Sequence, residues 1–395
     1  MSKERVIVAM SGGVDSSVAA AVLHDQGYDV IGVTMQLWDY GEPAAKKFGS
    51  CCSLSDVNDA RIVAHIVGVP HYVVNYEKEF RAGVVDYFAE EYAAGRTPNP
   101  CVMCNSKLKF DHLMDLATKL GAKWVATGHY ARIEHFSDGR PSVISRGIDT
   151  KKDQSYFLFN LKNEFIDRIL FPLSELTKDE VRRIAEKYQL PTSGKKDSQE
   201  ICFVAGGTYQ DFLSKHYPQM TQLRGELVDT AGNVLGTHDG IHLFTVGQRK
   251  GLHIYGPKPR YVAGIDPATN RVTVADIDEL AQTRFELKGV SWFAGVKWDD
   301  AEGVEGEVVL RYRAKALPAR AVPTAIPDQW TVELYQPASW VTPGQAAVFY
   351  RGDRLLGGGF IASPHESFGK RNDDRTGRTT VSTHLGGAAG ASVGH

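Results

Sequence analysis

The residues Ser11-Gly12-Gly13-Val14-Asp15-Ser16-Ser17 could bind an anion, because they follow a short apolar run and precede a helical pattern. Glycines let a backbone approach a ligand closely, and the hydroxyl and N–H groups at the start of a helix point towards negative charge. No Gly-Lys-Ser/Thr follows, which excludes a P-loop of the GxxxxGK[ST] kind, and the glycine spacing is not that of a dinucleotide-binding GxGxxG loop. The segment therefore predicts a phosphate-binding loop of another class.

The cysteines are the second group of residues that could do chemistry: Cys51, Cys52, Cys101, Cys104 and Cys202. In a reducing compartment such thiols are more typical of catalysis or metal binding than of structural disulfides. At Cys202, the preceding Lys195 and Lys196 would raise the thiolate fraction, which is small for an ordinary thiol at neutral pH. The flanking Ile201 and Phe203 are equally typical of a buried structural thiol.

Cys101 and Cys104 have the C-x-x-C spacing of half a metal site, and Cys51 and Cys52 are possible partners. Adjacent cysteines seldom form one half of a tetrahedral zinc site. An iron–sulfur cluster is an equally open alternative. A thioredoxin-like redox pair is disfavoured, because Cys101 and Cys104 lie in a proline-containing loop expected at residues 95–105. We expect no permanent metal and leave zinc and a cluster open.

The elements that must position these residues alternate between apolar runs and amphipathic segments up to about residue 190, which predicts a doubly wound α/β domain around a parallel sheet. Strands are expected at residues 6–10, 29–35, 71–75 and 123–128, and helices at 16–26, 55–67, 77–94 and 106–120. Each helical segment ends at a glycine suited to the position after a helix. A further helix should begin at the capping box of Thr177 and Glu180.

The pattern changes after about residue 206 to short alternating runs broken by glycine. Such runs occupy residues 225–240 and 261–276, and strand-like segments follow at 306–316, 329–339 and 345–361. This predicts a small linking domain followed by an antiparallel barrel or sandwich. We therefore expect an N-terminal α/β domain (1–205), a central linking domain (206–283), a C-terminal antiparallel β-barrel (284–364) and a disordered tail (365–395).

Composition excludes some functions. The 45 Lys plus Arg against 47 Asp plus Glu give a net charge of −2, so the chain is neither a polycation nor an acidic tail protein. Any contact with nucleic acid must come from local clusters such as Lys151-Lys152, Lys195-Lys196, Arg249-Lys250 and Arg311 with Arg313. The N-terminus lacks a secretory signal and no apolar run reaches about 18 residues, so we expect a cytoplasmic protein without a membrane span.

Other polar or adaptable residues follow the expected strands, namely Met35 and the run Gly128-His129-Tyr130. Ligands of open parallel sheets bind outside the carboxyl ends of the strands, so these residues and the loop should share one crevice. Met35 is equally consistent with a residue of the hydrophobic core that binds no ligand. The loop resembles the pyrophosphate loop (PP-loop) of ATP pyrophosphatases, which split ATP into AMP and pyrophosphate. That resemblance implies ATP and Mg²⁺, with Asp15 helping to hold the metal.

Several longer motifs lie in order along nearly the whole chain apart from the tail: SGGVDSS, TPNPCVMCN, ATGHYAR, KKDQSYFL, KKDSQEICF, TVGQRKGL, LRYRAK and TPGQAAVFY. Together they resemble the tRNA-specific 2-thiouridylase (MnmA/TrmU) family. The resemblance implies an enzyme that replaces the C2 oxygen of the wobble uridine, in the anticodon stem-loop of certain tRNAs, with sulfur and consumes ATP.

The same resemblance implies the reaction steps. ATP would adenylate the C2 oxygen, a persulfide on Cys202 would deliver the sulfur, and Cys104 would then form a disulfide with Cys202, to be reduced between turnovers. A cysteine desulfurase or a sulfur-relay protein would supply the persulfide sulfur. The two cysteines must come within bonding range, which demands a mobile segment over residues 194–204.

The resemblance also assigns residues to the site. The ATP site would contain Ala9, Met10, Ser11, Gly12, Gly13, Val14, Asp15, Ser16, Met35 and Gly128. The target base would contact Asn99, Pro100 and Cys101 with His129 and Gln345 nearby, and tRNA would be held by Lys152, Asp153, Gln154, Arg311 and Tyr312. Many family members carry aspartate at the position of Cys101, so a general-base role is in doubt there.

Two other functions remain open. The same type of loop serves synthetases that use ammonia or an amine as nucleophile on an adenylated substrate, and KKDSQEICF is similar to a segment of amidating synthetases. Such enzymes need no pair of reactive cysteines. A non-enzymatic tRNA-binding or sulfur-carrier protein is the second alternative, and adenylate production that depends on tRNA would count against it.

Overall fold

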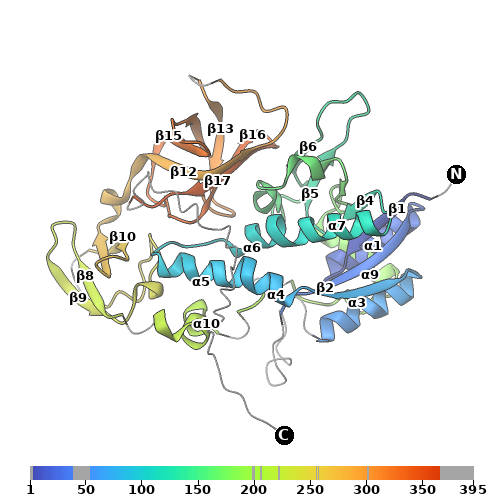
Figure 1. Ribbon diagram of the computed structural model, residues 1–395, viewed down its shortest axis with the longest axis horizontal. Helices are drawn as coiled ribbons and strands as arrows, with labels where there is room; N and C mark the ends of the chain where they lie inside the picture. The colour runs from blue at the N-terminus through green and yellow to red at the C-terminus, as the bar shows by residue number, and fades with distance from the viewer. Residues whose placement is uncertain are drawn as a thin grey trace, which may run out of the picture. The chain divides into compact units, whose positions relative to one another are not determined.

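The N-terminal region forms a five-stranded parallel sheet with the order β3-β2-β1-β4-β7 (Figure 1). Its strands are β1 Arg5–Ala9, β2 Asp29–Gln36, β3 His71–Asn75, β4 Trp124–Ala126 and β7 Ile169–Leu170. All neighbouring strands pair in parallel, and Val6 lies opposite Val30 on one side and Trp124 on the other. The predicted doubly wound sheet is confirmed, with β1 at its centre.

Helices cover both faces of this sheet. Side chains alternate between the two faces of a strand, so Val6 and Val8 face the opposite way from Ile7. Val6 and Val8 pack in one hydrophobic cluster with residues of α1 and α9, such as Val18 and Val181, while Ile7 belongs to a second cluster. The helices of the first face are α1 Val14–Asp25, α3 Leu54–Val67 and α9 Lys178–Lys187. The apolar strands follow from this burial on both sides.

The predicted helix ends are confirmed, because Gly27, Gly68, Gly95 and Gly121 all have positive φ angles. The predicted helix at 77–94 is divided into α4 Glu77–Phe80, the π-helical η1 Arg81–Val85 and α5 Asp86–Ala93. Gly83 lies within the π-helical turn, where its weak helix propensity gives the α-helix little support.

The expected loop at residues 95–105 is wrong in its second half, because the helix begins at Pro100. The segment consists of α6 Pro100–Met103, the π-helical η2 Cys104–Lys109 and α7 Phe110–Lys119. Asn99 is the N-cap, and its side chain accepts a hydrogen bond of 3.4 Å from the Val102 N–H. Proline is favourable at the first helical position, since its missing N–H would be unpaired there. Cys101 and Cys104 therefore lie on a helix.

A second sheet lies in the middle of the chain, with the order β10-β11-β8-β9. Its strands are β8 Gly225–Val228, β9 Val234–His238, β10 Tyr261–Asp266 and β11 Arg271–Ala275. Only the β8–β11 pair in this sheet is parallel. The buried side chains of Leu227, Val262 and Val272 form its own hydrophobic cluster.

The last described region is a closed antiparallel barrel of six strands, because β12 pairs with both β15 and β17. The strands are β12 Gln282–Trp292, β13 Val304–Val309, β14 Leu317–Pro323, β15 Gln329–Ala338, β16 Ala346–Arg351 and β17 Arg354–Ile361. The predicted barrel is confirmed. The strand expected at 306–316 ends at Val309, and the chain turns through Arg313, whose φ is +63°.

Shorter elements connect these sheets. They are the hairpin β5 Ala131–Glu134 and β6 Val143–Arg146, the turns η3 Ser155–Leu158 and η5 Ile241–Leu243, α8 Asn163–Ile166, and α10 Tyr209–His216. Strand β6 pairs with β17, with Ser145 opposite Arg354, so the hairpin extends the barrel sheet.

The computed structural model describes residues 3–38, 54–197, 201–204, 207–220, 223–254, 256, 258–299 and 302–364. Cys51, Cys52, part of the predicted mobile segment at 198–200 and the predicted tail at 365–395 lie outside these residues. Within the described part of the chain, no helix has the length and apolar character needed to cross a membrane.

Candidate phosphate and thiol site

The predicted phosphate-binding loop lies between β1 and α1, at the place where the order of the parallel strands reverses. The chain runs outward from β1 through β2 to β3 on one side, and returns on the other side through β4. In doubly wound folds, ligands bind outside the carboxyl ends of the two strands that flank such a switch point, here β1 and β4. The loop thus occupies the position that the sheet topology favours for a nucleotide.

Hydrogen bonds within the loop fix its shape. The Ser11 N–H donates to Ser16 Oγ (3.1 Å), and the hydroxyls of Ser16 and Ser17 donate to the Gly13 carbonyl (3.1 and 2.8 Å). Gly12 has a φ of +74°, and a Cβ there would lie 2.2 Å from the Asp56 carbonyl oxygen. Glycine is therefore required at Gly12 by both the backbone angle and the space.

The other residues assigned to the ATP site divide into loop neighbours and core residues. Gly128 follows β4 and contacts the loop directly, because a Cβ there would lie 2.8 Å from the Ser16 nitrogen. Met10, Val14 and Met35 are buried in the hydrophobic clusters. Ala9 ends β1 and packs against one of them. The contact of Gly128 with the loop agrees with the expected convergence of two strand ends.

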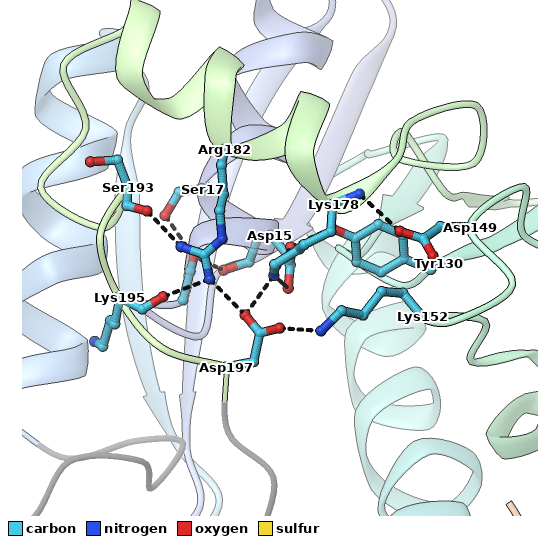
Figure 2. A network of polar contacts seen from close by, with 12 residues as sticks. Asp15, Ser17, Tyr130, Asp149, Lys152, Lys178, Arg182, Ser193, Lys195 and Asp197 are labelled. Atoms are coloured by element: carbon cyan, nitrogen blue, oxygen red, sulfur yellow. Dashed lines mark hydrogen bonds and ion pairs between the residues drawn. The ribbon is translucent and has the colours of Figure 1, made fainter. Parts of the chain in front are cut away.

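A network of charged groups surrounds Asp15 (Figure 2). The Lys178 ammonium, in a residue that is 7% exposed, donates to both carboxylate oxygens of Asp15 at 2.7 and 2.8 Å. The Tyr130 hydroxyl donates to Asp15 Oδ1 at 2.7 Å. Burial, together with the Asp15 carboxylate, raises the pKa of Tyr130, so this hydroxyl remains a donor. On its other side, Lys178 pairs with Asp197 at 2.8 Å.

Lys178 and Asp197 are not among the site residues predicted from the sequence. One signal for Lys178 was present, because the capping box places this lysine at the first position of α9. A positive charge is disfavoured at the N-terminus of a helix, so a buried lysine there requires negative partners. Asp15 lies 163 positions away in the sequence, and local patterns do not reveal such a pair.

The expected role of Asp15 as a magnesium ligand stays a prediction, and in the structure its carboxylate already has other partners. Mg²⁺ requires near-octahedral oxygen ligands at about 2.0–2.1 Å. Both Asp15 oxygens instead accept hydrogen bonds from a buried ammonium group, and one also accepts from Tyr130. Among the described residues, no group of three or more His, Cys, Asp or Glu side chains is arranged to hold a metal. The charge that faces Asp15 is that of Lys178.

Lys195 joins the segment before Cys202 to the loop. Its ammonium donates to the Gly12 carbonyl (2.9 Å), Asp56 Oδ1 (2.5 Å) and Asp59 Oδ2 (2.7 Å). Burial would lower the pKa of Lys195, but the hydrogen bonds to the two carboxylates outweigh it and hold the pKa above its ordinary value. Its charge is therefore directed at the loop and these carboxylates.

The two cysteines proposed as catalytic contribute to one hydrophobic cluster. Cys104 is 6% exposed and begins the π-helical turn η2, while Cys202 is partly buried and packs against the same cluster. Phe203 anchors the second cysteine, since its ring lies 5.3 Å from that of Phe88 and 5.2 Å from that of Phe212. Cys101 is exposed. π-Helical turns are frequent at functional sites, and here one begins at Cys104.

The barrel contributes residues next to the start of the cysteine helix. Gln345 donates to the Thr97 carbonyl at 2.8 Å, and the Thr97 N–H donates to the Pro343 carbonyl at 2.8 Å. The Tyr156 hydroxyl donates to the Ala346 carbonyl at 2.9 Å. Gln345 is thus beside the segment that leads to Asn99 and Pro100.

The residues expected to hold tRNA differ in their surroundings. Asp153 is buried and accepts hydrogen bonds from Arg146, the Gly147 N–H and Ser155, so its carboxylate fixes local structure. Gln154 accepts from the Tyr130 N–H at 3.1 Å.

The two basic segments nevertheless lie together. Arg313 donates to the Lys151 carbonyl at 3.0 Å, and the rings of Tyr312 and Phe157 are 4.5 Å apart. Arg311 is exposed. The segment at Lys151-Lys152 and the turn at 311–313 therefore form one basic surface.

His129 lies between aromatic rings, 6.2 Å from Phe110 and 5.9 Å from Phe171. Its Nδ1 is 2.6 Å from Thr127 Oγ1. Burial, with a smaller contribution from Lys109, lowers the pKa of His129 to about 3. The ring is therefore neutral over the working pH range.

This pKa predicts a pH dependence of stability. Between pH 6.5 and about 3, the unfolded chain binds a proton at this histidine that the folded protein does not bind. The contribution of His129 to the free energy of unfolding is therefore complete above pH 6.5. It decreases as the pH falls, by at most about 1.4 kcal/mol per pH unit. We expect the urea midpoint to fall less steeply from pH 6.5 to 5 in His129→Gln than in the wild type. Equal slopes would contradict this assignment.

The sequence is similar to three protein-family models and to known proteins. The tRNA methyl transferase HUP domain matches residues 4–206, the tRNA methyl transferase PRC-barrel domain residues 210–276, and the aminomethyltransferase beta-barrel domain residues 282–361. The tRNA-specific 2-thiouridylase MnmA of Geobacter metallireducens is 47% identical over 363 residues, covering 91% of this chain and 97% of the relative.

The chain is also similar to a second curated relative, at high sequence identity, and to a solved structure, at low sequence identity. The protein of the same name from Geotalea uraniireducens is 48% identical over 362 residues, covering 91% of this chain and 95% of the relative. A solved 4-thiouridine synthetase–RNA complex with bound ATP is 18% identical, with a TM-score of 0.35, and covers 55% of this chain and 51% of that chain.

Proposed function

The chain belongs to the tRNA-specific 2-thiouridylase family, and on that premise we propose that it replaces the C2 oxygen of the wobble uridine of tRNA with sulfur at the expense of ATP. The observation that carries the proposal is that the glycine- and serine-rich loop lies at the switch point of a parallel sheet, and that Cys104 and Cys202 both contribute to the hydrophobic cluster that contains Ile7 of the central strand. An adenylating enzyme without sulfur chemistry would need only the first of these.

The loop at residues 11–17 binds the phosphates of ATP through the backbone N–H groups at the start of α1. The C2 oxygen of uracil is a poor leaving group, so its attack on the α-phosphorus first converts it to an adenylate and releases pyrophosphate. The oxygen then departs within AMP. Lys178 supplies a fixed positive charge beside Asp15, and Mg²⁺ bound with ATP would neutralise further phosphate charge.

Sulfur transfer uses the two cysteines. The terminal sulfur of a Cys202 persulfide attacks the activated C2 and expels AMP, which leaves C2 bonded to sulfur and that sulfur bonded to Cys202. The Cys104 thiolate attacks the Cys202 sulfur, forms a disulfide and releases the thiolated base. A dithiol reductant restores both thiols, and a cysteine desulfurase or sulfur-relay protein restores the persulfide. We place this reaction in the cytoplasm.

Two regions of the protein position the tRNA substrate. Asn99, Pro100 and Cys101, with Gln345 and the neutral ring of His129, surround the target base, which must leave the anticodon stack to reach the crevice. The basic surface at Lys151-Lys152 and residues 311–313 holds the tRNA backbone. We assign residues 1–205 to catalysis, 206–283 to a linking domain and 284–364 to a tRNA-binding barrel.

Isotope transfer tests the adenylation step. Unmodified tRNA carrying ¹⁸O at C2 of its uridines is incubated with the protein, ATP, Mg²⁺ and a persulfide donor. The ¹⁸O content of the released AMP is measured by mass spectrometry. We expect one ¹⁸O in AMP for each thiolated base. Labelled oxygen in water or inorganic phosphate would contradict adenylation. Labelled AMP together with an amino group at C2 when ammonia is present would instead support the amidating alternative.

A further inference from the structure

Three cations converge on one carboxylate beside the loop (Figure 2). Asp197 accepts hydrogen bonds from Lys152 at 2.5 Å, from Lys178 at 2.8 Å and from Arg182 at 3.3 Å. The guanidinium of Arg182 is held in place by the carbonyls of Ser193 (2.8 Å) and Lys195 (3.1 Å). Such a cluster is the kind of surrounding that a phosphate group prefers.

The cluster is connected to the loop through Lys178. An ammonium group has three donors, and all three are engaged here, by two oxygens of Asp15 and one of Asp197. A phosphate that binds Lys178 must therefore displace a carboxylate. Asp197 is the replaceable one, because its partners Lys152, Lys178 and Arg182 are all cations that a phosphate group can also bind, whereas Asp15 is fixed in the first turn of α1 and bonded to Tyr130.

Asp197 is well suited to remain an anion in this position. Burial alone would raise the pKa of Asp197, but hydrogen bonds from Lys152 and Lys178 outweigh it, and the pKa lies below the ordinary value of a carboxyl. The carboxylate therefore carries its negative charge throughout the pH range in which ATP is used.

We infer that Asp197 is an internal competitor for a phosphate group of ATP and of the pyrophosphate product, with Lys152, Lys178 and Arg182 as the shared cations. This rests on the proposed function. Pyrophosphate carries several negative charges, so an unopposed cluster of three cations would retain it and delay the next turnover. Competition from Asp197 weakens substrate and product binding alike, which lowers affinity but speeds product release.

Pyrophosphate binding to the full-length protein tests the inference. Calorimetry with inorganic pyrophosphate should show binding about tenfold tighter in Asp197→Asn than in the wild type, roughly the effect of one charge-assisted hydrogen bond. Binding of AMP, which lacks the β and γ phosphates, should not change. In turnover with tRNA, the first equivalent of AMP should form at the wild-type rate, and the steady-state rate should fall. If the role of Asp197 were purely structural, the substitution would not tighten the binding of any ligand.

Two further variants keep the test decisive. Asp353→Asn removes an acid that pairs with Arg132 at 3.2 Å on the barrel, and it should leave pyrophosphate binding unchanged. If Asp197→Asn fails to fold, Lys152→Gln is the substitute, since that half-exposed lysine should contribute to pyrophosphate affinity, and unchanged affinity would overturn the inference.

The outcomes separate the two proposals. Wild-type protein that binds neither ATP nor pyrophosphate would refute the proposed function. Wild-type protein that binds both, with equal or weaker pyrophosphate binding in Asp197→Asn, would refute the competitor inference and leave the proposed function intact.

Discussion

Replacing Cys202 with serine should abolish 2-thiouridine formation, by at least about a thousandfold, while tRNA-dependent release of pyrophosphate in the adenylation step continues. A serine hydroxyl cannot carry a persulfide, so no sulfur reaches the activated C2. The loop and its charged partners are untouched by the change, because Cys202 packs against the hydrophobic cluster. The measurement is the amount of 2-thiouridine in digested tRNA, compared with the pyrophosphate formed in the same reaction.

The other two described cysteines provide matched variants. Cys104→Ser should stop the reaction after sulfur has bonded to C2, so that tRNA remains linked to Cys202 and multiple turnover is lost. Cys101→Ser should keep most of the activity, because Cys101 is exposed and lies outside the hydrophobic cluster. Full activity of Cys202→Ser, or equal loss in Cys101→Ser and Cys104→Ser, would contradict the assignment of the thiols.

Gly12→Ala should weaken ATP binding by at least about a hundredfold. The backbone at Gly12 has a φ of +74°, which costs an alanine roughly 1–2 kcal/mol. The added Cβ would also lie 2.2 Å from the Asp56 carbonyl oxygen, a main-chain atom that cannot rotate away. The loop must therefore move away from α3, and its N–H groups lose their alignment. Calorimetric titration with ATP measures the effect.

Gly83→Ala is the control for this variant. Gly83 lies in η1, and a Cβ there would meet nothing within 4 Å, so ATP affinity should match that of the wild type. Circular dichroism of both variants shows whether the fold is kept. Normal ATP binding by a folded Gly12→Ala protein would mean that this loop does not bind the phosphates.

Most of the fold follows from local sequence signals. The apolar runs identified four of the five parallel strands, and the glycines marked four helix ends. The missed strand β7 has only two residues, too few to give a pattern. The helix start at Pro100 has a sequence signal, because Asn99-Pro100 is a favourable cap and first position, but prolines are also typical of loops and the same residues therefore predict a loop.

The charged part of the site could not be predicted in the same way. Lys178 pairs with Asp15 across 163 positions, and Lys195 pairs with Asp56 across 139. Such contacts depend on how α9 and the following segment pack against α1 and α3, and no local periodicity encodes that. The loop itself was recognisable, since its glycines and hydroxyls act through neighbouring backbone.

Mass spectrometry of tRNA nucleosides tests the central claim most directly. Unmodified tRNA is incubated with the protein, ATP, Mg²⁺ and a persulfide-generating donor, and then digested. We predict 2-thiouridine at the wobble position, formed only with ATP and absent with Cys202→Ser. A wobble uridine that stays unmodified, or that gains a methyl group instead of sulfur, would contradict the account.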